Sequence, residues 1–300
     1  MKLRIGTRRS RLALAQAGEV ATLLSALGVE TELVPMVTGG DSGTPAAASS
    51  PAGVKGLFVA EIVQALQEGR VDLAVHSAKD LPADDPPGVM IGAVPERAGP
   101  FDVLVTRAGD LPDGSVVGTS SLRRRAQLIR SRPGVSVTDL RGNVDTRLRK
   151  LEEGQVDGLV LAAAGLERLG IAPLHATPMP LEEMVPAPGQ GALAVQVRTD
   201  DRPTLEIVKA LDHLRSRVAI TAERDLMRAV GGGCALPLGA YAEARTDEVR
   251  LLAVVIRPDG TDLAWGQASA NDPHQVAAEV AEILMSGGAG EILAQVRAVR

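Results

Sequence analysis

The 300-residue sequence is poor in cysteine and in aromatic residues. Its one cysteine, Cys234, excludes an internal disulfide, and with four scattered histidines it argues against a Cys/His metal site, so we expect no metal. The aromatic residues are Phe58, Phe101, Tyr241 and Trp265, too few to form a platform on which nucleic-acid bases stack. Together with a net charge of −5, this argues against nucleic acid as a partner.

The sequence also lacks a long hydrophobic run. No stretch approaches the roughly 18 apolar residues that a membrane span needs. Residues 1–5 lead into a strand-like segment without the apolar core of a signal peptide. We therefore expect a cytoplasmic protein with no membrane contact, and nothing in the sequence demands more than a monomer.

What the sequence has in excess is arginine. The 32 basic residues are 27 arginines and five lysines. A GC-rich genome would favour arginine codons, so the places where the arginines fall are more informative than their number. Otherwise, with 45% hydrophobic and 23% charged residues, the composition is that of an ordinary globular protein, long enough for two or three domains.

Short apolar strands alternate with helical patterns through the first two hundred residues, which predicts an α/β fold. Two Pro/Gly-rich segments, 95–100 and 185–191, bracket the second αβ series. The chain thus leaves the first unit and returns to it, as is typical of two-lobed proteins that close on a ligand. We expect domain 1 at 1–96 plus 192–212, domain 2 at 100–187 and a small α+β domain 3 at 215–300.

In domain 3 the pattern predicts one helix over 218–230, two strands over 249–256 and 263–268, and two closing helices. The strands are joined by a hairpin turn at Pro258-Asp259-Gly260. Earlier in the chain, residues 39–56 are too rich in Gly, Ser, Ala and Pro to build a core. We interpret them as a long mobile loop of the kind that serves as a functional lid, followed by a helix from Leu57.

The segment 74–82, A-V-H-S-A-K-D-L-P, is the most informative. It continues an apolar run, 71–75, that predicts a buried strand. The polar residues placed just beyond this strand are His76, Ser77, Lys79 and Asp80. Ligands bind at the carboxyl ends of strands in open α/β sheets, although a surface turn closed by Leu81 and Pro82 is an equally simple interpretation of this segment alone.

Three other strand-to-helix junctions carry the same chemistry: residues 7–10, 119–124 and 141–143, where Asn143 is an expected N-cap. Each places hydroxyls, backbone N–H groups and cations at one edge of a sheet, an arrangement that suits anions. Arginine in particular binds carboxylates in bidentate fashion. Together with Arg147 and Arg168, the four junctions favour a pocket for a ligand with many carboxylates or phosphates over a solvated surface.

Two residues do not fit a simple anion-binding site. A carboxylate such as Asp80 weakens anion binding, so it needs another task, such as stabilising developing positive charge or moving protons. Cys234 follows three glycines, which allow a close approach of the backbone and suit a thiol presented into a cleft. With no histidine beside it in sequence, this thiol fits a covalent anchor better than a hydrolytic nucleophile, and an ordinary buried cysteine is the simpler alternative.

In combination these motifs resemble the porphobilinogen deaminase (hydroxymethylbilane synthase) family along nearly the whole chain. The matching segments are 75–82, 118–124, 140–147, 161–170, 188–192 and 232–242. The resemblance implies two α/β domains like those of periplasmic binding proteins, with a hinged cleft, and a third domain that bears the cofactor. It implies a transferase of tetrapyrrole (haem) biosynthesis that joins four porphobilinogens head to tail, with loss of ammonia, into hydroxymethylbilane.

The resemblance also implies residue roles. Cys234 would hold a dipyrromethane cofactor through a thioether, and Asp80 would be the catalytic carboxylate. The further cofactor-binding residues would be Lys79, Thr119, Ser121, Arg123, Arg124, Arg141, Gly142 and Gln190. The substrate-binding residues would be Arg8, Ser10, Arg147, Arg168, Lys55 and Phe58. The chain departs from the family pattern in the 39–56 loop, with Pro51 where a lysine is common and Gly39 or Gly40 where an arginine is common.

Two other functions would explain part of the pattern. A two-lobed anion-binding or sensor protein accounts for a cleft and its arginines but not for Asp80 or the Gly-Gly-Gly-Cys segment. A nucleic-acid-binding role for the arginines at 123–125 conflicts with the acidic net charge and the scarcity of aromatics.

Overall fold

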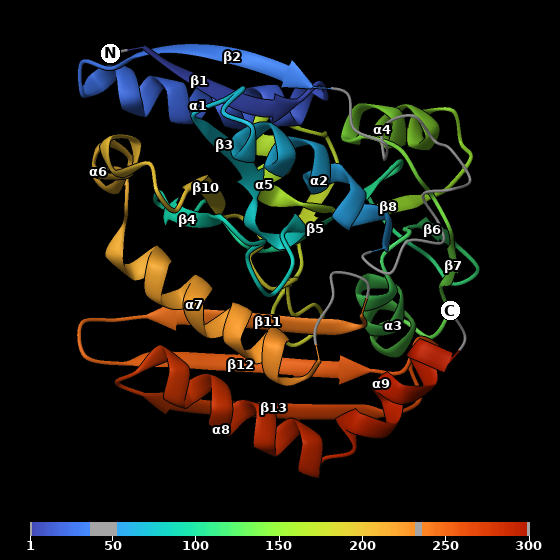
Figure 1. Ribbon diagram of the computed structural model, residues 1–300. Helices are drawn as coiled ribbons and strands as arrows, with labels where there is room; N and C mark the ends of the chain where they lie inside the picture. The colour runs from blue at the N-terminus through green and yellow to red at the C-terminus, as the bar shows by residue number, and fades with distance from the viewer. Residues whose placement is uncertain (1, 37–52, 232–235, 299–300) are drawn as a thin grey trace.

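Three β-sheets organise the structure, one in each of two lobes and one in a C-terminal domain (Figure 1). The computed structural model describes residues 2–36, 53–231 and 236–298, and over 53–58 it describes the backbone alone. In this part of the chain no helix has the length and apolar character needed to cross a membrane.

The first lobe has a five-stranded sheet in the order β2-β1-β3-β10-β4, in which β10 runs antiparallel to both neighbours. Its strands are β1 (Lys2–Arg8), β2 (Glu30–Met36), β3 (Leu73–Ser77), β4 (Val89–Ala93) and β10 (Leu193–Arg198). Its helices are α1 (Arg11–Ala26), α2 (Gly53–Gln67) and α6 (Arg202–Lys209). The central strands are apolar on both faces because α1 covers one face and α2 the other.

The second lobe repeats this arrangement, with the order β7-β6-β8-β5-β9 and β5 antiparallel to β8. Its strands are β5 (Asp102–Thr106), β6 (Val116–Gly118), β7 (Ser136–Thr138), β8 (Gly158–Ala162) and β9 (Ala176–Pro178). Its helices are α3 (Leu122–Ser131), α4 (Val144–Glu152) and α5 (Ala163–Arg168).

The chain crosses between the lobes twice. The first crossing joins β4 to β5, and the second joins β9 to β10, which returns to lie between β3 and β4 of the first sheet. The prediction of two α/β lobes with a small α+β C-terminal domain is therefore confirmed. The residue boundaries given for the three domains remain predictions.

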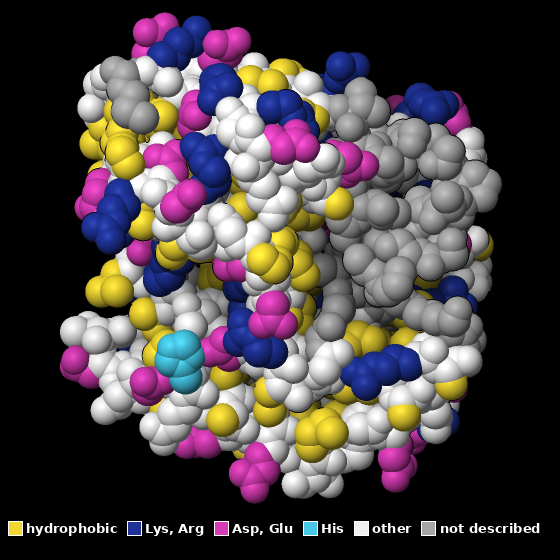
Figure 2. All heavy atoms as spheres, viewed as in Figure 1, with side chains coloured by type: hydrophobic (Ala, Val, Ile, Leu, Met, Phe, Trp, Pro, Cys, Tyr) yellow, Lys and Arg dark blue, Asp and Glu magenta, His cyan; other side chains and the backbone are white. Residues whose placement is uncertain are grey.

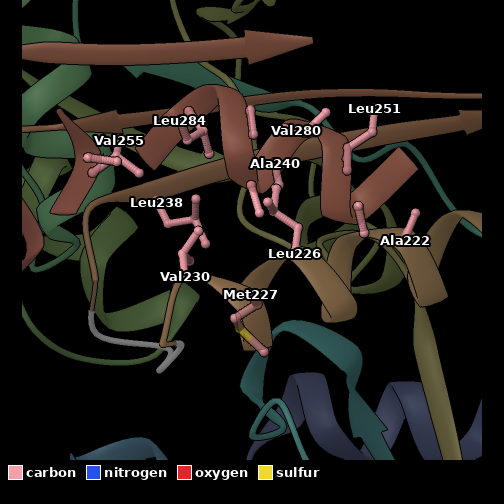
Figure 3. Close-up of a cluster of buried hydrophobic side chains, with 14 of the residues drawn as sticks. Ala222, Leu226, Met227, Val230, Leu238, Ala240, Leu251, Val255, Val280 and Leu284 are labelled. Carbon is pink, nitrogen blue, oxygen red and sulfur yellow. The ribbon is translucent and has the colours of Figure 1, made fainter. Parts of the chain in front are cut away.

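The C-terminal domain is an antiparallel sheet of β11 (Leu238–Ala244), β12 (Val249–Ile256) and β13 (Leu263–Ala270). Helices α7 (Leu214–Ala229), α8 (Pro273–Ser286) and α9 (Ala289–Ala298) complete it. Side chains of α7 and α8 pack with those of the strands in one buried apolar cluster (Figure 3). The predicted hairpin turn is confirmed, since the Gly260 N–H donates to the Arg257 carbonyl at 2.8 Å and Gly260 has a positive φ of 81°.

Two expectations about elements were wrong. The strand β11 was missed because its sequence, L-G-A-Y-A-E-A, has little β-propensity, and its stability comes from pairing with β12 and from burial of Ala240 and Ala242. Helix α2 begins at Gly53, so it includes the last residues that we assigned to the loop. The rest of that loop, 39–52, lies outside the described residues.

A buried carboxylate ties the C-terminal domain to both crossings. Glu223 on α7 has no exposed surface and accepts two hydrogen bonds from the Arg97 guanidinium, at 2.7 and 3.1 Å. It also accepts from the backbone N–H groups of Gly189, at 2.6 Å, and Ala242, at 2.7 Å. Arg97 belongs to the first crossing, Gly189 to the second and Ala242 to β11. One side chain therefore joins three parts of the fold.

We expect Glu223→Ala to lower the free energy of unfolding by about 3–5 kcal/mol, because it leaves the buried Arg97 guanidinium without its counter-ion. Glu243→Ala is the control, since the half-exposed Glu243 carboxylate makes a 3.4 Å ion pair with Arg245 that contributes about 1 kcal/mol or less. Urea denaturation measures both. Equal, small losses in the two variants would contradict the role given to Glu223.

Candidate active site

The turn that carries Asp80 directly follows β3. Lys79 and Asp80 lie in a 3-10 turn, η2 (Ala78–Asp80), at the carboxyl end of the strand, as predicted. His76 and Ser77 were expected beyond the strand but belong to it, because their pairing with Ala194 and Leu193 of β10 extends β3.

Asp80 acts electrostatically on groups from both lobes. Burial lowers the pKa of His76, on β3, to about 4; Asp80 opposes this shift and Arg8 adds to it. Burial and the neighbouring Arg124 lower the pKa of Arg147, on α4 of the second lobe, to about 10, and Asp80 again opposes the shift. Asp80 thus lies within electrostatic reach of His76 in the first lobe and of Arg147 in the second.

A second buried carboxylate, Asp102 at the start of β5, organises the arginines of α3. Arg123 donates to it at 2.7 Å, and Arg124 donates two hydrogen bonds at 2.7 and 3.1 Å. Burial alone would raise the pKa of Asp102, but the two guanidinium groups hold it well below its usual range. Gln190 of the second crossing also donates to Asp102, at 3.0 Å, and accepts from Lys79 at 3.4 Å. This network links the residue beside Asp80 to the second lobe.

This arrangement bears on the predicted role of Arg123 and Arg124 in ligand binding. The resemblance gives them ligand carboxylates to bind, yet both are buried and already bound to Asp102. Their contact with a ligand remains a prediction. Asp102 itself was missed: an acidic residue opening a buried strand is a usable signal, but nothing in the sequence pairs it with residues 123 and 124.

Arg147 and Arg168 are better placed to hold an external anion. Arg168, at the end of α5, donates through Nε to Glu19 of α1 at 2.7 Å, and its Nη2 is buried with no hydrogen-bond partner among the described residues. The hydrogen bond that Arg147 makes within the described ranges is from Nε to the Gly142 carbonyl, at 2.6 Å. Gly142 has a φ of 128°, a conformation that favours glycine. Desolvated N–H groups of this kind suit carboxylates.

The predicted hydroxyl groups serve first as helix and turn caps. Ser10 and Ser121 are the N-caps of α1 and α3, where their oxygens accept from backbone N–H groups at 3.3 and 3.4 Å. The buried Thr119 oxygen accepts from the Ser121 N–H at 3.2 Å. Asn143 occupies the N-cap position of α4, as predicted, but within the described residues its side chain makes no capping hydrogen bond. Each serine or threonine O–H is still able to donate to a ligand.

The remaining predicted residues are less closely tied to Asp80. Arg141 is exposed and forms an ion pair with Asp139 at 3.1 Å. Lys55 and Phe58 belong to α2, but their side chains, like the whole of Cys234, lie outside the described residues.

Within residues 2–36, 53–231 and 236–298, no cluster of His, Cys, Asp or Glu could hold a metal ion. Acidic and basic side chains are interspersed over the face shown in Figure 2, without a large patch of one sign.

The buried His76 gives a testable dependence of stability on pH. Its pKa is about 4 when folded and about 6.5 when unfolded, so the unfolded state binds the extra proton between these values and acid favours unfolding. From pH 7 to pH 5 this costs the wild type about 2 kcal/mol, a loss that His76→Asn should remove. His175→Asn, at a half-buried histidine beside β9, is the control and should keep the wild-type dependence. Urea denaturation at both pH values measures the difference, and an unchanged dependence in His76→Asn would contradict the assignment.

Comparison with known proteins agrees with the resemblance seen in the sequence. Residues 3–206 match the family described as porphobilinogen deaminase, dipyromethane cofactor binding domain, and residues 218–286 match porphobilinogen deaminase, C-terminal domain. A porphobilinogen deaminase from Brevibacillus brevis is 45% identical over 302 residues, covering 98% of this chain and 97% of the relative. One from Desulforudis audaxviator is 48% identical with the same coverage. The chain belongs to the porphobilinogen deaminase family.

Proposed function

We propose that this protein joins four porphobilinogen molecules head to tail, with loss of ammonia, into the linear tetrapyrrole hydroxymethylbilane. This would make it a hydroxymethylbilane synthase, a transferase of haem biosynthesis, and we expect a cytoplasmic monomer. The observation that supports the proposal is that Asp80 of the first lobe lies within electrostatic reach of the Arg147 guanidinium of the second lobe, in a chain that matches its family over nearly its whole length.

The residues present fit a polycarboxylate cofactor. Arg147 is desolvated beside a second cation, and Arg168 has a buried N–H group without a partner among the described residues. Each pyrrole of a dipyrromethane carries two carboxylates, so such a group would satisfy both arginines. When bound through Cys234, it supplies the pyrrole carbon to which substrate is added. Lys79, the residue before Asp80, donates to Gln190, which in turn donates to Asp102, and Lys79 and Gln190 would hold further carboxylates.

Asp80 would act on the substrate itself. As ammonia leaves porphobilinogen, positive charge develops on the substrate ring, and a nearby carboxylate stabilises that charge. The same carboxylate would take up and release protons. The predicted substrate-binding arginines, among them Arg147, would bind the acetate and propionate groups of the substrate and orient the ring toward Asp80. In this proposal, cationic residues bind the substrate and the anionic Asp80 stabilises the charge that develops on it.

The alternative of a two-lobed anion-binding or sensor protein would use the same lobes and arginines. It gives no task to Asp80, whose negative charge opposes anion binding, and the curated relatives described above are deaminases. Turnover separates the two functions, since a binding protein takes up porphobilinogen without releasing ammonia.

We expect Asp80→Asn to fold and to carry its cofactor but to release ammonia about 100-fold or more slowly than the wild type, because only the charge is removed. Asp110→Asn is the control, since Asp110 is an exposed carboxylate of the second lobe. Steady-state rates per cofactor-loaded molecule measure the effect. A rate for Asp80→Asn within about threefold of the control would refute the role of Asp80.

We expect Cys234→Ala to fold and to have the mass of the unmodified chain. The wild type should carry a surplus equal to two porphobilinogen units less two ammonias, located on Cys234 by peptide mapping. Circular dichroism of both proteins checks the fold. Attachment at any other residue, or the same surplus on Cys234→Ala, would rule out this anchor.

A further inference from the structure

Helix α7 of the C-terminal domain holds the segment that follows Asp80. Arg224, on α7, donates to the Pro82 carbonyl at 2.9 Å and to the Ala83 carbonyl at 3.0 Å. It also forms an ion pair with Asp85 at 3.1 Å, and its side chain is only 10% exposed. One guanidinium thus binds two successive carbonyls and a carboxylate of the same short segment.

A second arginine, one turn further along α7, adds to this contact. Arg228 donates to the Ala83 carbonyl at 3.0 Å and pairs with Asp84. Both Arg228 and Asp84 are largely exposed, so solvent screens the pair and we expect it to contribute little. The buried Arg224 is therefore the principal anchor.

The segment that Arg224 binds has no regular secondary structure of its own. Residues 81–87 form neither helix nor strand, so no ladder of backbone hydrogen bonds fixes their path. On the amino-terminal side of Asp80, the turn η2 is continuous with β3, which is paired with β10. On the carboxyl-terminal side, the chain is held by the burial of Leu81 and Ala83 and by side-chain contacts, of which those of Arg224 reach residues 82, 83 and 85. Arg228 and a 3.3 Å hydrogen bond from Gln196 to Asp85 add to them.

We propose that Arg224 is a positioning residue that holds the Asp80 carboxylate at its working position from the C-terminal domain. This inference rests on the proposed function. A catalytic group displaced by about 1 Å can lose on the order of 100-fold in rate. Loosening the segment that Arg224 binds, residues 82–85, should therefore reduce turnover. A purely structural Arg224 would affect stability alone.

The same helix offers a matched control. Arg217 on α7 also donates to two successive carbonyls, those of Ile91 at 3.2 Å and Gly92 at 3.0 Å, and pairs with Asp212 at 2.8 Å. It makes the same kind of contact with the first lobe, but with β4 and not with the segment after Asp80. Arg217→Gln therefore removes interactions of the same kind, from a side chain that is 29% exposed, without loosening that segment.

The experiment compares Arg224→Gln and Arg217→Gln as cofactor-loaded proteins, with loading measured by intact mass and ammonia release measured across porphobilinogen concentrations. We expect both variants to lower Tm to a similar extent. Arg224→Gln alone should lower kcat, by about tenfold or more, with KM within about twofold of the wild type. Equal kcat losses in the two variants, or a wild-type kcat in Arg224→Gln, would overturn the inference.

If Arg224→Gln does not fold, Arg224→Lys and Arg217→Lys provide the same comparison of kcat values. Lysine retains the cation but lacks the planar fork that binds two carbonyls and a carboxylate at once. We expect Arg224→Lys to fold with kcat reduced about threefold or more, and Arg217→Lys to keep the wild-type kcat. Matching kcat values in the two lysine variants would overturn the inference. A wild type that released no ammonia would overturn both the inference and the proposed function, whereas loss of the Arg224 effect alone leaves the function standing.

Discussion

The structure depends on buried carboxylates that allow arginines to gather at one place. Asp102 forms ion pairs with two buried guanidinium groups, those of Arg123 and Arg124. Burying such cations costs free energy of desolvation unless a counter-ion is buried with them. Because Asp102 also binds Gln190, which in turn binds Lys79, the same carboxylate connects the second lobe to the turn of Asp80. Without Asp102, Arg123 and Arg124 would repel each other, and the cost of burying their charges would not be offset by a counter-ion.

The C-terminal domain supplies a further constraint through one helix. Glu223 of α7 binds both crossings between the lobes, and Arg224, the next residue, binds the segment after Asp80. Figure 1 shows α7 lying between the C-terminal sheet and the first lobe. In sequence, the same helix leads to the Gly-rich segment before Cys234. A single helix thus contacts both crossings between the lobes and the segment that follows Asp80.

The local features of the chain could be predicted from its sequence because they depend on neighbouring residues. The strand-to-helix junctions, the N-cap position of Asn143 and the turn at Gly260 all follow from short patterns. The partners of buried charges could not be predicted in this way. Asp102 and Arg123 lie 21 residues apart in sequence, and Gly189 and Glu223 lie 34 apart, so their pairing depends on how distant segments pack together.

The two errors in the strand predictions, at β11 and at the end of β3, also come from contacts between distant parts of the chain. β11 is rich in alanine and glycine, and it forms because β12 and the cluster beneath α7 stabilise it. His76 was placed outside β3 because it is polar, yet a neutral, buried imidazole fits within a strand. Both errors arise where tertiary packing overrides a local preference.

The most direct test of the central claim, that this site carries out chemistry on porphobilinogen and does not merely bind it, is a timed incubation of the purified wild-type protein with porphobilinogen. Released ammonia and the intact mass of the protein are followed together. The account predicts ammonia in proportion to the porphobilinogen consumed, and species whose masses rise by one substrate unit less one ammonia at each step. Saturable binding of porphobilinogen with no ammonia and no covalent gain in mass would contradict it.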